Sequence, residues 1–306
     1  MFMIVKGMGT GVSILLLILI GVLYGVILGF LIAYVNIPPW IATLAGFLAF
    51  RGLGTSILSN NSTTGSLAPF PVSFQNVFYG RVFPTNKGVF NIPCFAAGLL
   101  AAAVITLVIF LNRKNRIKKG YEADTIRTAC LKSVISAAAV LLVMYKLAWD
   151  GGIPTTLLWV AGIVLIYSFI TSKTTIGRHF YVVGGNMEAA RLSGVNTRRI
   201  MFLAYLNMAV LTAIATFTVV ARSQSAYADV GKNFEMDAIS ACVVGGVSAT
   251  GGAGSVLGMV IGATLIGIIN LGMSLISLDA NYQRVVKGFV LLAAVVFDIL
   301  SQKKER

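Results

Sequence analysis

Long apolar runs, separated by short polar segments, fill most of the sequence. The first of them, from Gly11 to Val35, is longer than the about 20 residues that a helix needs to cross a bilayer. Hydrophobic residues make up 57% of the chain and charged residues only 11%, a balance that soluble globular domains do not have. Lipid offers no partner to backbone N–H and C=O groups, and runs of this length satisfy them as helices. The sequence therefore predicts an all-α polytopic transmembrane helix bundle.

Eight to nine membrane crossings fit this pattern, and we expect the whole chain, 1–306, to form a single transmembrane domain. The segment 237–250 is short for a full span, so we interpret it as a broken or half helix that neighbouring helices complete. The expected crossings are 11–35, 40–58, 93–111, 129–147, 154–172, 200–221, 237–250, 255–278 and 285–300. The main polar segments are 59–92, with a short interfacial helix over 73–79, then 112–127 and 173–199.

Lysine and arginine are distributed unevenly between the polar segments. Of the 24 in the chain, fourteen fall in 112–127, 173–199 and 301–306, whereas 59–92 holds two. Basic residues gather in loops that stay in the cytoplasm, so we expect the first three segments inside and the last one outside. The same rule accounts for the net charge of +14, and no nucleic-acid partner is needed to explain it. The basic run 113–119 could also bind membrane lipid, although such runs more often only fix topology.

A polar island, Gly184–Gly194, interrupts the apolar pattern and predicts a short helix outside the membrane. Asn186 is a plausible N-cap, and Glu188 suits the first turn of a helix. Glu188 also stands three residues before Arg191, a spacing at which opposite charges meet on a helix. Gly194 is placed to end the helix.

The same island predicts a ridge of small side chains. On a helix, Ala189 shares a face with Ser193, and Ala190 shares a face with Gly194. Small residues let another protein approach the backbone closely. We therefore expect a docking helix that fits a groove on a partner.

Two glycine stripes at a spacing of four residues predict close helix–helix packing in the membrane. They are Gly21, Gly25 and Gly29 in the first span, and Gly254, Gly258 and Gly262 around the start of the eighth.

Three polar or aromatic residues in or near the apolar segments are candidates for a transport pathway: Asn207, Asn270 and Tyr282. The two asparagines could bind a sugar hydroxyl or a neighbouring helix, and we favour helix packing. Tyr282 could stack on a sugar, although membrane interfaces also enrich tyrosine.

Four blocks of the sequence carry a family resemblance: Pro38–Gly46, Gly177–Val195, Asp237–Gly258, and Tyr282-Gln283 with Lys287-Gly288 and Asp298. In this order they resemble the permease subunits of bacterial ATP-binding-cassette (ABC) importers for monosaccharides, the ribose, xylose and galactose permeases. Gly152–Thr155 and Asn270–Ser274 are most similar to the xylose and multiple-monosaccharide permeases. Members usually begin with further hydrophobic helices carrying Gly-Gly-Ile-Asp-Leu-Ser-Val-Gly. We find no such stretch here, so we expect Met1 to enter the family pattern partway in.

The resemblance implies a multi-pass protein of the bacterial cytoplasmic (inner) membrane that imports a xylose-like sugar or several monosaccharides. It implies three protein partners: a cytoplasmic ATP-binding subunit that supplies the energy, a second permease subunit in a homodimer, and an external sugar-binding protein. The polar island corresponds to the "EAA" coupling loop of these permeases. The coupling residues that this implies are Gly185, Asn186, Glu188, Ala189, Ala190, Arg191, Ser193 and Gly194.

An ion- or proton-coupled secondary carrier is the alternative. Such carriers usually need ionisable groups within the membrane, whereas the carboxylates here fall in loops or at span ends and His179 falls in a loop. Backbone carbonyls can bind Na⁺, so the alternative stays open. A membrane enzyme has the least support: Gly251–Ser255 lacks the lysine of a phosphate-binding P-loop, and we expect no catalytic residue, metal or cofactor.

The charge distribution makes the topology testable. Because 112–127 and 173–199 together hold eleven Lys and Arg, both should face the cytoplasm. Cysteines introduced at Lys118 and Arg191 should therefore resist an impermeant thiol reagent in intact cells and react after permeabilisation. Labelling of either position from outside would contradict the predicted topology.

Overall fold

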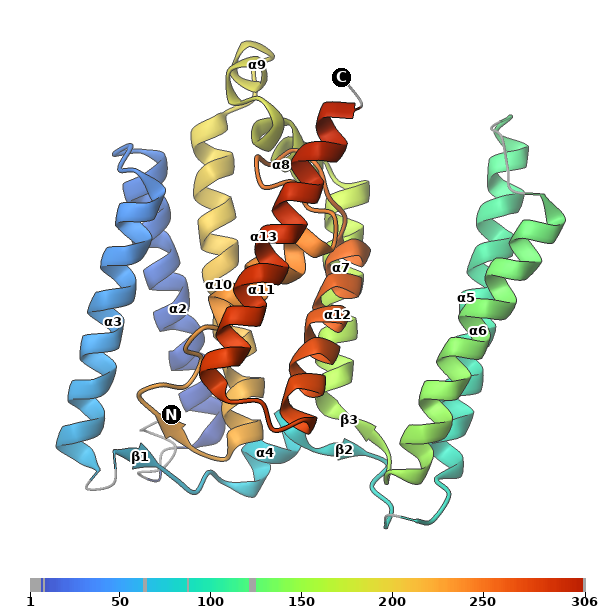
Figure 1. The fold of residues 1–306 in the computed structure, drawn as a ribbon, viewed down its shortest axis with the longest axis horizontal. Helices are drawn as coiled ribbons and strands as arrows, with labels where there is room; N and C mark the ends of the chain where they lie inside the picture. Colours follow the sequence, from blue (N-terminus) through green and yellow to red (C-terminus); the bar gives the residue numbers. More distant parts are fainter. Residues whose placement is uncertain (1–6, 8, 63–64, 87, 121–124, 305–306) are drawn as a thin grey trace. The chain divides into compact units, whose positions relative to one another are not determined.

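The computed structural model describes residues 7, 9–62, 65–86, 88–120 and 125–304, except for the side chains of 301–304. Helices dominate it (Figure 1), which confirms the prediction of an all-α bundle. In chain order the elements are α2 (Thr10–Ala33), α3 (Pro39–Asn61), β1 (Ser66–Leu67), α4 (Val72–Tyr79), β2 (Arg81–Val82), α5 (Ile92–Lys118), α6 (Ile126–Trp149), β3 (Ile153–Pro154), α7 (Thr155–Lys173), α8 (Thr175–Gly185), α9 (Met187–Leu192), α10 (Thr197–Ser223), β4 (Ala226–Tyr227), α11 (Phe234–Val244), α12 (Val256–Leu275) and α13 (Ala280–Lys304).

Seven helices in the described residues are long and apolar enough to cross a membrane: α2, α3, α5, α6, α7, α10 and α12. They coincide with seven of the expected crossings. The remaining two expected crossings correspond to α11 and α13, which are not among these seven. With 11 residues, α11 is about 17 Å long at a rise of about 1.5 Å per residue, well below the about 30 Å of a hydrocarbon core. A short helix over this segment is thus confirmed, and the total of eight to nine crossings stays a prediction.

The chain divides into two compact units, residues 76–159 and residues 1–75 with 160–306. In the smaller unit α5 packs against α6, and β2 pairs antiparallel with β3. Asn91 caps the start of α5: its side chain accepts from the Cys94 N–H at 3.0 Å and donates to the Phe83 carbonyl at 2.5 Å. Further along, a Cβ on Gly98 would lie 2.6 Å from Cβ of Met144, so α5 and α6 approach closely there.

In the larger unit, the first glycine stripe lies against α10. A Cβ on Gly21 would lie 2.9 Å from Cβ of Ala213, and one on Gly25 would lie 2.7 Å from Cβ of Ala209. At Gly29 the same atom would approach a backbone carbonyl of α10 to 3.0 Å. Because real Cβ atoms hardly ever come closer than 3.0 Å, α2 and α10 can adopt this separation only without side chains at these positions.

The second stripe lies against α11 and the turn that follows it. A Cβ on Gly262 would lie 2.7 Å from the backbone nitrogen of Gly245, and one on Gly258 would overlap the Gly245 carbonyl. Gly254 has φ +140°, and a Cβ there would lie 2.9 Å from a methyl carbon of Val247. The short helix α11 is therefore held to α12 through direct backbone contact.

The expected helix in the 59–92 segment is confirmed as α4. At its N-terminal end Phe74 is fully buried and stacks edge-on against Phe217 of α10, with the ring centroids 6.3 Å apart. Nearby, β1 pairs with β4 through Ser66 and Tyr227. These contacts fasten the start of the segment to the loop after α10.

Helix α12 offers a matched test of the backbone contact. Leucine at Gly258 would collide with the Gly245 carbonyl, whereas nothing lies within 4 Å of a Cβ on Gly267 in the same helix. Gly258→Leu should therefore abolish folding or assembly, since overpacking typically costs about 1–3 kcal/mol and a rigid backbone cannot yield easily. Gly267→Leu should be tolerated. Membrane expression and thermal unfolding of both variants check this, and normal behaviour of Gly258→Leu would contradict the contact.

Candidate coupling loop and polar sites

The segment 173–199 folds into two consecutive helices, α8 and α9, before α10 begins. Thr174 caps α8 by accepting from the Gly177 N–H at 3.2 Å. Asn186 caps α9 by accepting from the Ala189 N–H at 3.0 Å, as predicted. Helix α9 ends at Leu192, and Gly194 follows with φ +83°, a left-handed conformation that favours glycine. The short helix and both of its predicted boundaries are confirmed.

Charged and polar groups cover the outer side of α9. Glu188 and Arg191 approach to 3.9 Å as predicted, with about three quarters of each side chain exposed. An exposed pair at this distance contributes little to stability. Gly185 and Asn186 are exposed as well. The two charges are therefore available to a partner protein.

The predicted ridge of small residues is wrong for Ala190. Its exposure is 0%, because it packs against Val183 of α8 and Ile200 of α10. Ala189 and Ser193 are exposed, and the Ser193 hydroxyl donates to the Ala189 carbonyl at 2.8 Å. Spacing along a helix defines shared faces but does not say which face turns inward. Ala190 thus anchors α9 to the rest of the chain.

Leu192 is the residue of α9 that the sequence interpretation missed. It is 88% exposed, at the C-terminal end of the helix, and Met187 at the other end is 47% exposed. An apolar side chain in a polar island was a usable signal, because it has no lipid to face there. Leu192 and Met187 are thus the large apolar side chains that α9 exposes.

The end of α8 meets the glycine-rich loop between α11 and α12. A Cβ on Gly184 would lie 2.9 Å from the backbone nitrogen of Gly252, and one on Gly252 would lie 2.9 Å from the nitrogen of Gly185. The Tyr181 hydroxyl donates to the Gly254 carbonyl at 3.0 Å. We call residues 251–254 the glycine loop. It joins the α8–α9 pair to α11 and α12 by backbone contacts.

The three candidate pathway residues lie in different surroundings. Asn207 of α10 accepts a hydrogen bond from the Tyr167 hydroxyl of α7. Asn270 of α12 donates to Oδ2 of Asp237 at 3.2 Å. Both asparagines therefore contact neighbouring helices, as we favoured. Tyr282 is 67% exposed at the start of α13.

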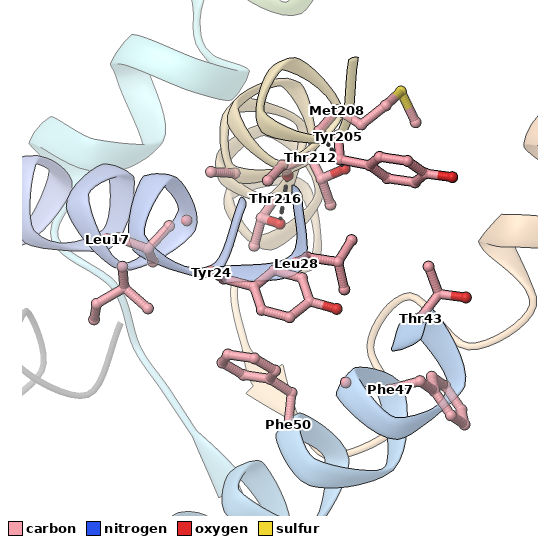
Figure 2. A pocket seen from close by; sticks show the side chains of 15 residues that line it. Leu17, Tyr24, Leu28, Thr43, Phe47, Phe50, Tyr205, Met208, Thr212 and Thr216 are labelled. Atoms are coloured by element: carbon pink, nitrogen blue, oxygen red, sulfur yellow. Dashed lines mark hydrogen bonds between the residues drawn. The ribbon is translucent and has the colours of Figure 1, made fainter. Parts of the chain in front are cut away.

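A large apolar cavity lies between α2, α3 and α10 (Figure 2). It measures 530 Å³, and aromatic rings of Tyr24, Phe47 and Phe50 border it. The hydroxyls of Thr212 and Thr216 bond to carbonyls of their own helix at 2.8 Å, so they offer little to a ligand. This lining suits hydrocarbon better than a sugar.

In the part of the chain that the structure describes, seven apolar helices of spanning length define a polytopic membrane protein, with the helices α8 and α9 between α7 and α10. The comparison with known families agrees. Residues 1–295 match the family described as branched-chain amino acid transport system / permease component, and the chain belongs to this family. It is therefore a multi-pass protein of the bacterial inner membrane.

Several curated relatives are similar over most of the chain. The xylose transport system permease protein of Haemophilus influenzae is 36% identical over 96% of this chain and 75% of its own length. Its counterpart in Escherichia coli K12 is 33% identical over 95% of this chain and 72% of its own length. The ribose import permease protein of H. influenzae is 40% identical over 82% and 78%, respectively. No solved structure matches at a significant level.

Neighbouring alanines in α9 give a test of its orientation. Ala190→Arg places a charge where the exposure is 0%, so it should loosen α9, at a cost of more than about 2 kcal/mol. Ala189→Arg puts the same side chain on the exposed side and should be nearly neutral. Hydrogen exchange of the amides of residues 187–195 measures the difference. Equal protection in the two variants would mean that Ala190 does not anchor the helix.

Proposed function

We propose that this protein is the membrane-spanning permease subunit of an ATP-driven importer for monosaccharides, a xylose-like sugar or several of them. The observation that carries the proposal is the similarity to the xylose and ribose permeases over most of the chain. The exposed helix α9, with its apolar end at Leu192, supports it.

The partners follow from this role. A cytoplasmic ATP-binding subunit docks on α9 and hydrolyses ATP. A second copy of the permease completes the membrane channel, and an external sugar-binding protein delivers the sugar. The permease itself lowers no chemical barrier: it changes which side of the membrane the sugar can reach.

The contacts of α8 suggest how closure of the ATP-binding subunits reaches the membrane. A push on α9 is passed to α8 through the packing of Ala190 against Val183. The C-terminal end of α8 in turn contacts Gly251 and Gly252 of the glycine loop. Because α11 and α12 flank this loop, a shift of α8 tilts them together. Alternating access then arises from movement of this helix pair.

Helix α9 also allows a test that separates this proposal from an ion-coupled carrier. Leu192 is 88% exposed, so Leu192→Asp should leave the permease folded. An apolar anchor at the centre of an interface contributes about 2 kcal/mol or more, so this variant should lose co-purification with the ATP-binding subunit and ATP-driven uptake. Both are measured in cells that express the permease with its partners.

The matched control is Ile117→Asp, another exposed apolar residue in a segment expected on the cytoplasmic side. It should leave uptake unchanged. Full uptake by Leu192→Asp, with uptake abolished by a protonophore, would instead favour the ion-coupled carrier.

A further inference from the structure

Side chains from three different helices form a polar cluster in the larger unit. Nζ of Lys287 in α13 lies 2.8 Å from Oδ1 and 2.9 Å from Oδ2 of Asp237 in α11. Asn270 in α12 donates to the same carboxylate at 3.2 Å. Only the tertiary fold brings these residues together, because 50 and 33 residues separate the partners. We call Asp237, Asn270 and Lys287 the polar triad.

The internal contacts of the triad leave hydrogen-bonding capacity unused. A carboxylate offers about four acceptor sites and an ammonium group three donors. The side chains of Asp237 and Lys287 stay 26% and 23% exposed, whereas Oδ1 of Asp237 itself is buried. Asn270 orients the carboxylate although its own Oδ1 is buried without a hydrogen-bond partner in the described residues. Asn270 therefore fixes the position of the Asp237 carboxylate, while its own side-chain oxygen makes no hydrogen bond within the described residues.

A pocket of 430 Å³ lies beside the triad, between α11 and α13. Asp237 and Lys287 line it, together with Lys232, Asn233, Gln283 and Arg284. Its volume falls within the about 300–1,000 Å³ that is typical of small-molecule sites. The pocket thus combines a carboxylate, three cations and two amides in a space that a monosaccharide would fit.

This lining matches the chemistry of a neutral polyhydroxy molecule. Each sugar hydroxyl both donates and accepts, so it needs acceptors and donors side by side, and the paired Asp237 and Lys287 supply both. The charges of this pair balance each other, and Lys232 and Arg284 add further donors for hydroxyl oxygens. Phe234 and Met236 add apolar surface for the C–H side of a sugar ring. By contrast, the apolar cavity between α2, α3 and α10 offers no comparable set.

The pocket also lies where an importer would receive its cargo. Its lining comes from residues 232–240 and 280–291, next to the segments 222–236 and 279–284 that contain few basic residues. By the charge rule these segments belong to the external side. A sugar released outside would meet this pocket at the external end of α11 and α13.

We propose that this pocket is a monosaccharide-binding site of the permease, with Asp237 and Lys287 as its paired hydrogen-bonding groups. The identity of the ligand rests on the proposed function, whereas the site rests on the geometry of α11, α12 and α13. Asn270 acts as a positioning residue that holds the carboxylate.

Alkylation of introduced cysteines tests the site directly. Met236→Cys lies in the pocket lining, and Tyr282→Cys lies on α13 outside it; the native side chains are 51% and 67% exposed. The purified full chain in lipid nanodiscs is treated with a maleimide, and mass spectrometry reads each position separately from the native cysteines. D-xylose or D-ribose at roughly ten times its dissociation constant should slow labelling at position 236 about tenfold and leave position 282 unchanged.

Three outcomes would overturn the proposal. One is equal labelling at position 236 with and without sugar over the full range of solubility. The second is protection by inorganic phosphate but not by sugar, which would make the pocket an anion site served by Lys232 and Arg284. Protection at Tyr282→Cys alone would likewise move the sugar away from this pocket.

Substitutions in the triad separate ligand binding from helix packing. Asp237→Asn keeps the shape but removes the charge, so binding of radiolabelled sugar should weaken about tenfold or more. The matched control, Glu235→Gln, changes an exposed carboxylate of the same helix outside the pocket lining and should bind normally. The double variant Asp237→Lys with Lys287→Asp restores an ion pair in reverse. It should recover folding but not sugar binding, and recovery of both would reduce the pair to a packing contact.

Failure of the site and failure of the proposed function give different results. Alkylation and binding use the permease alone, without ATP or partners. If sugar does not protect Met236→Cys but uptake depends on ATP and on α9, the proposed site is wrong and the proposed function stands. If sugar protects Met236→Cys but uptake does not depend on ATP, the proposed site stands and the proposed function is wrong.

Discussion

The direct backbone contact between α11 and α12 is the constraint on which the larger unit depends. Lipid gives no hydrophobic drive for two helices to associate, so close packing of small residues supplies the attraction. Gly258 and Gly262 bring α12 against Gly245, where α11 ends. With only 11 residues, α11 is shorter than a full membrane span. The chain after the helix satisfies its last turn: the carbonyls of Ala241, Cys242 and Val243 accept from the N–H groups of Gly245, Val247 and Gly246.

The two ends of α11 serve different neighbours, which gives this short helix its importance. Its C-terminal end leads into the glycine loop, which contacts α8 through Gly184 and Gly185. Its N-terminal turn carries Asp237, bound to Lys287 of α13. A displacement of α8 would therefore reach the polar pocket through one rigid helix. Glycines suit such a junction, since side chains there would separate the backbones, and a displacement of one helix would then move the other less directly.

Local patterns predicted local structure well. Asn186 and Gly194 mark the boundaries of α9 because capping depends on residues three or four positions away. The glycine stripes predicted close helix packing, although no pattern named α10 or α11 as the partner. Ala190 shows the limit: its face was predictable but its inward orientation depends on Ile200, which belongs to another helix. The Asp237–Lys287 pair could not be predicted from the sequence, since the two residues are 50 positions apart and only the fold brings them together.

The ion pair in the pocket is a weak device for holding three helices together. Both side chains keep about a quarter of their surface exposed, so water screens the attraction between the two charges. Part of the remaining attraction only offsets the hydration that the two charges lose. A well-packed apolar pair of the same size would hold the helices about as firmly. The glycine contacts already hold two of these helices, α11 and α12, together without any charge. What the pair adds is a fixed donor and a fixed acceptor facing a pocket, and these are the groups that a sugar hydroxyl requires.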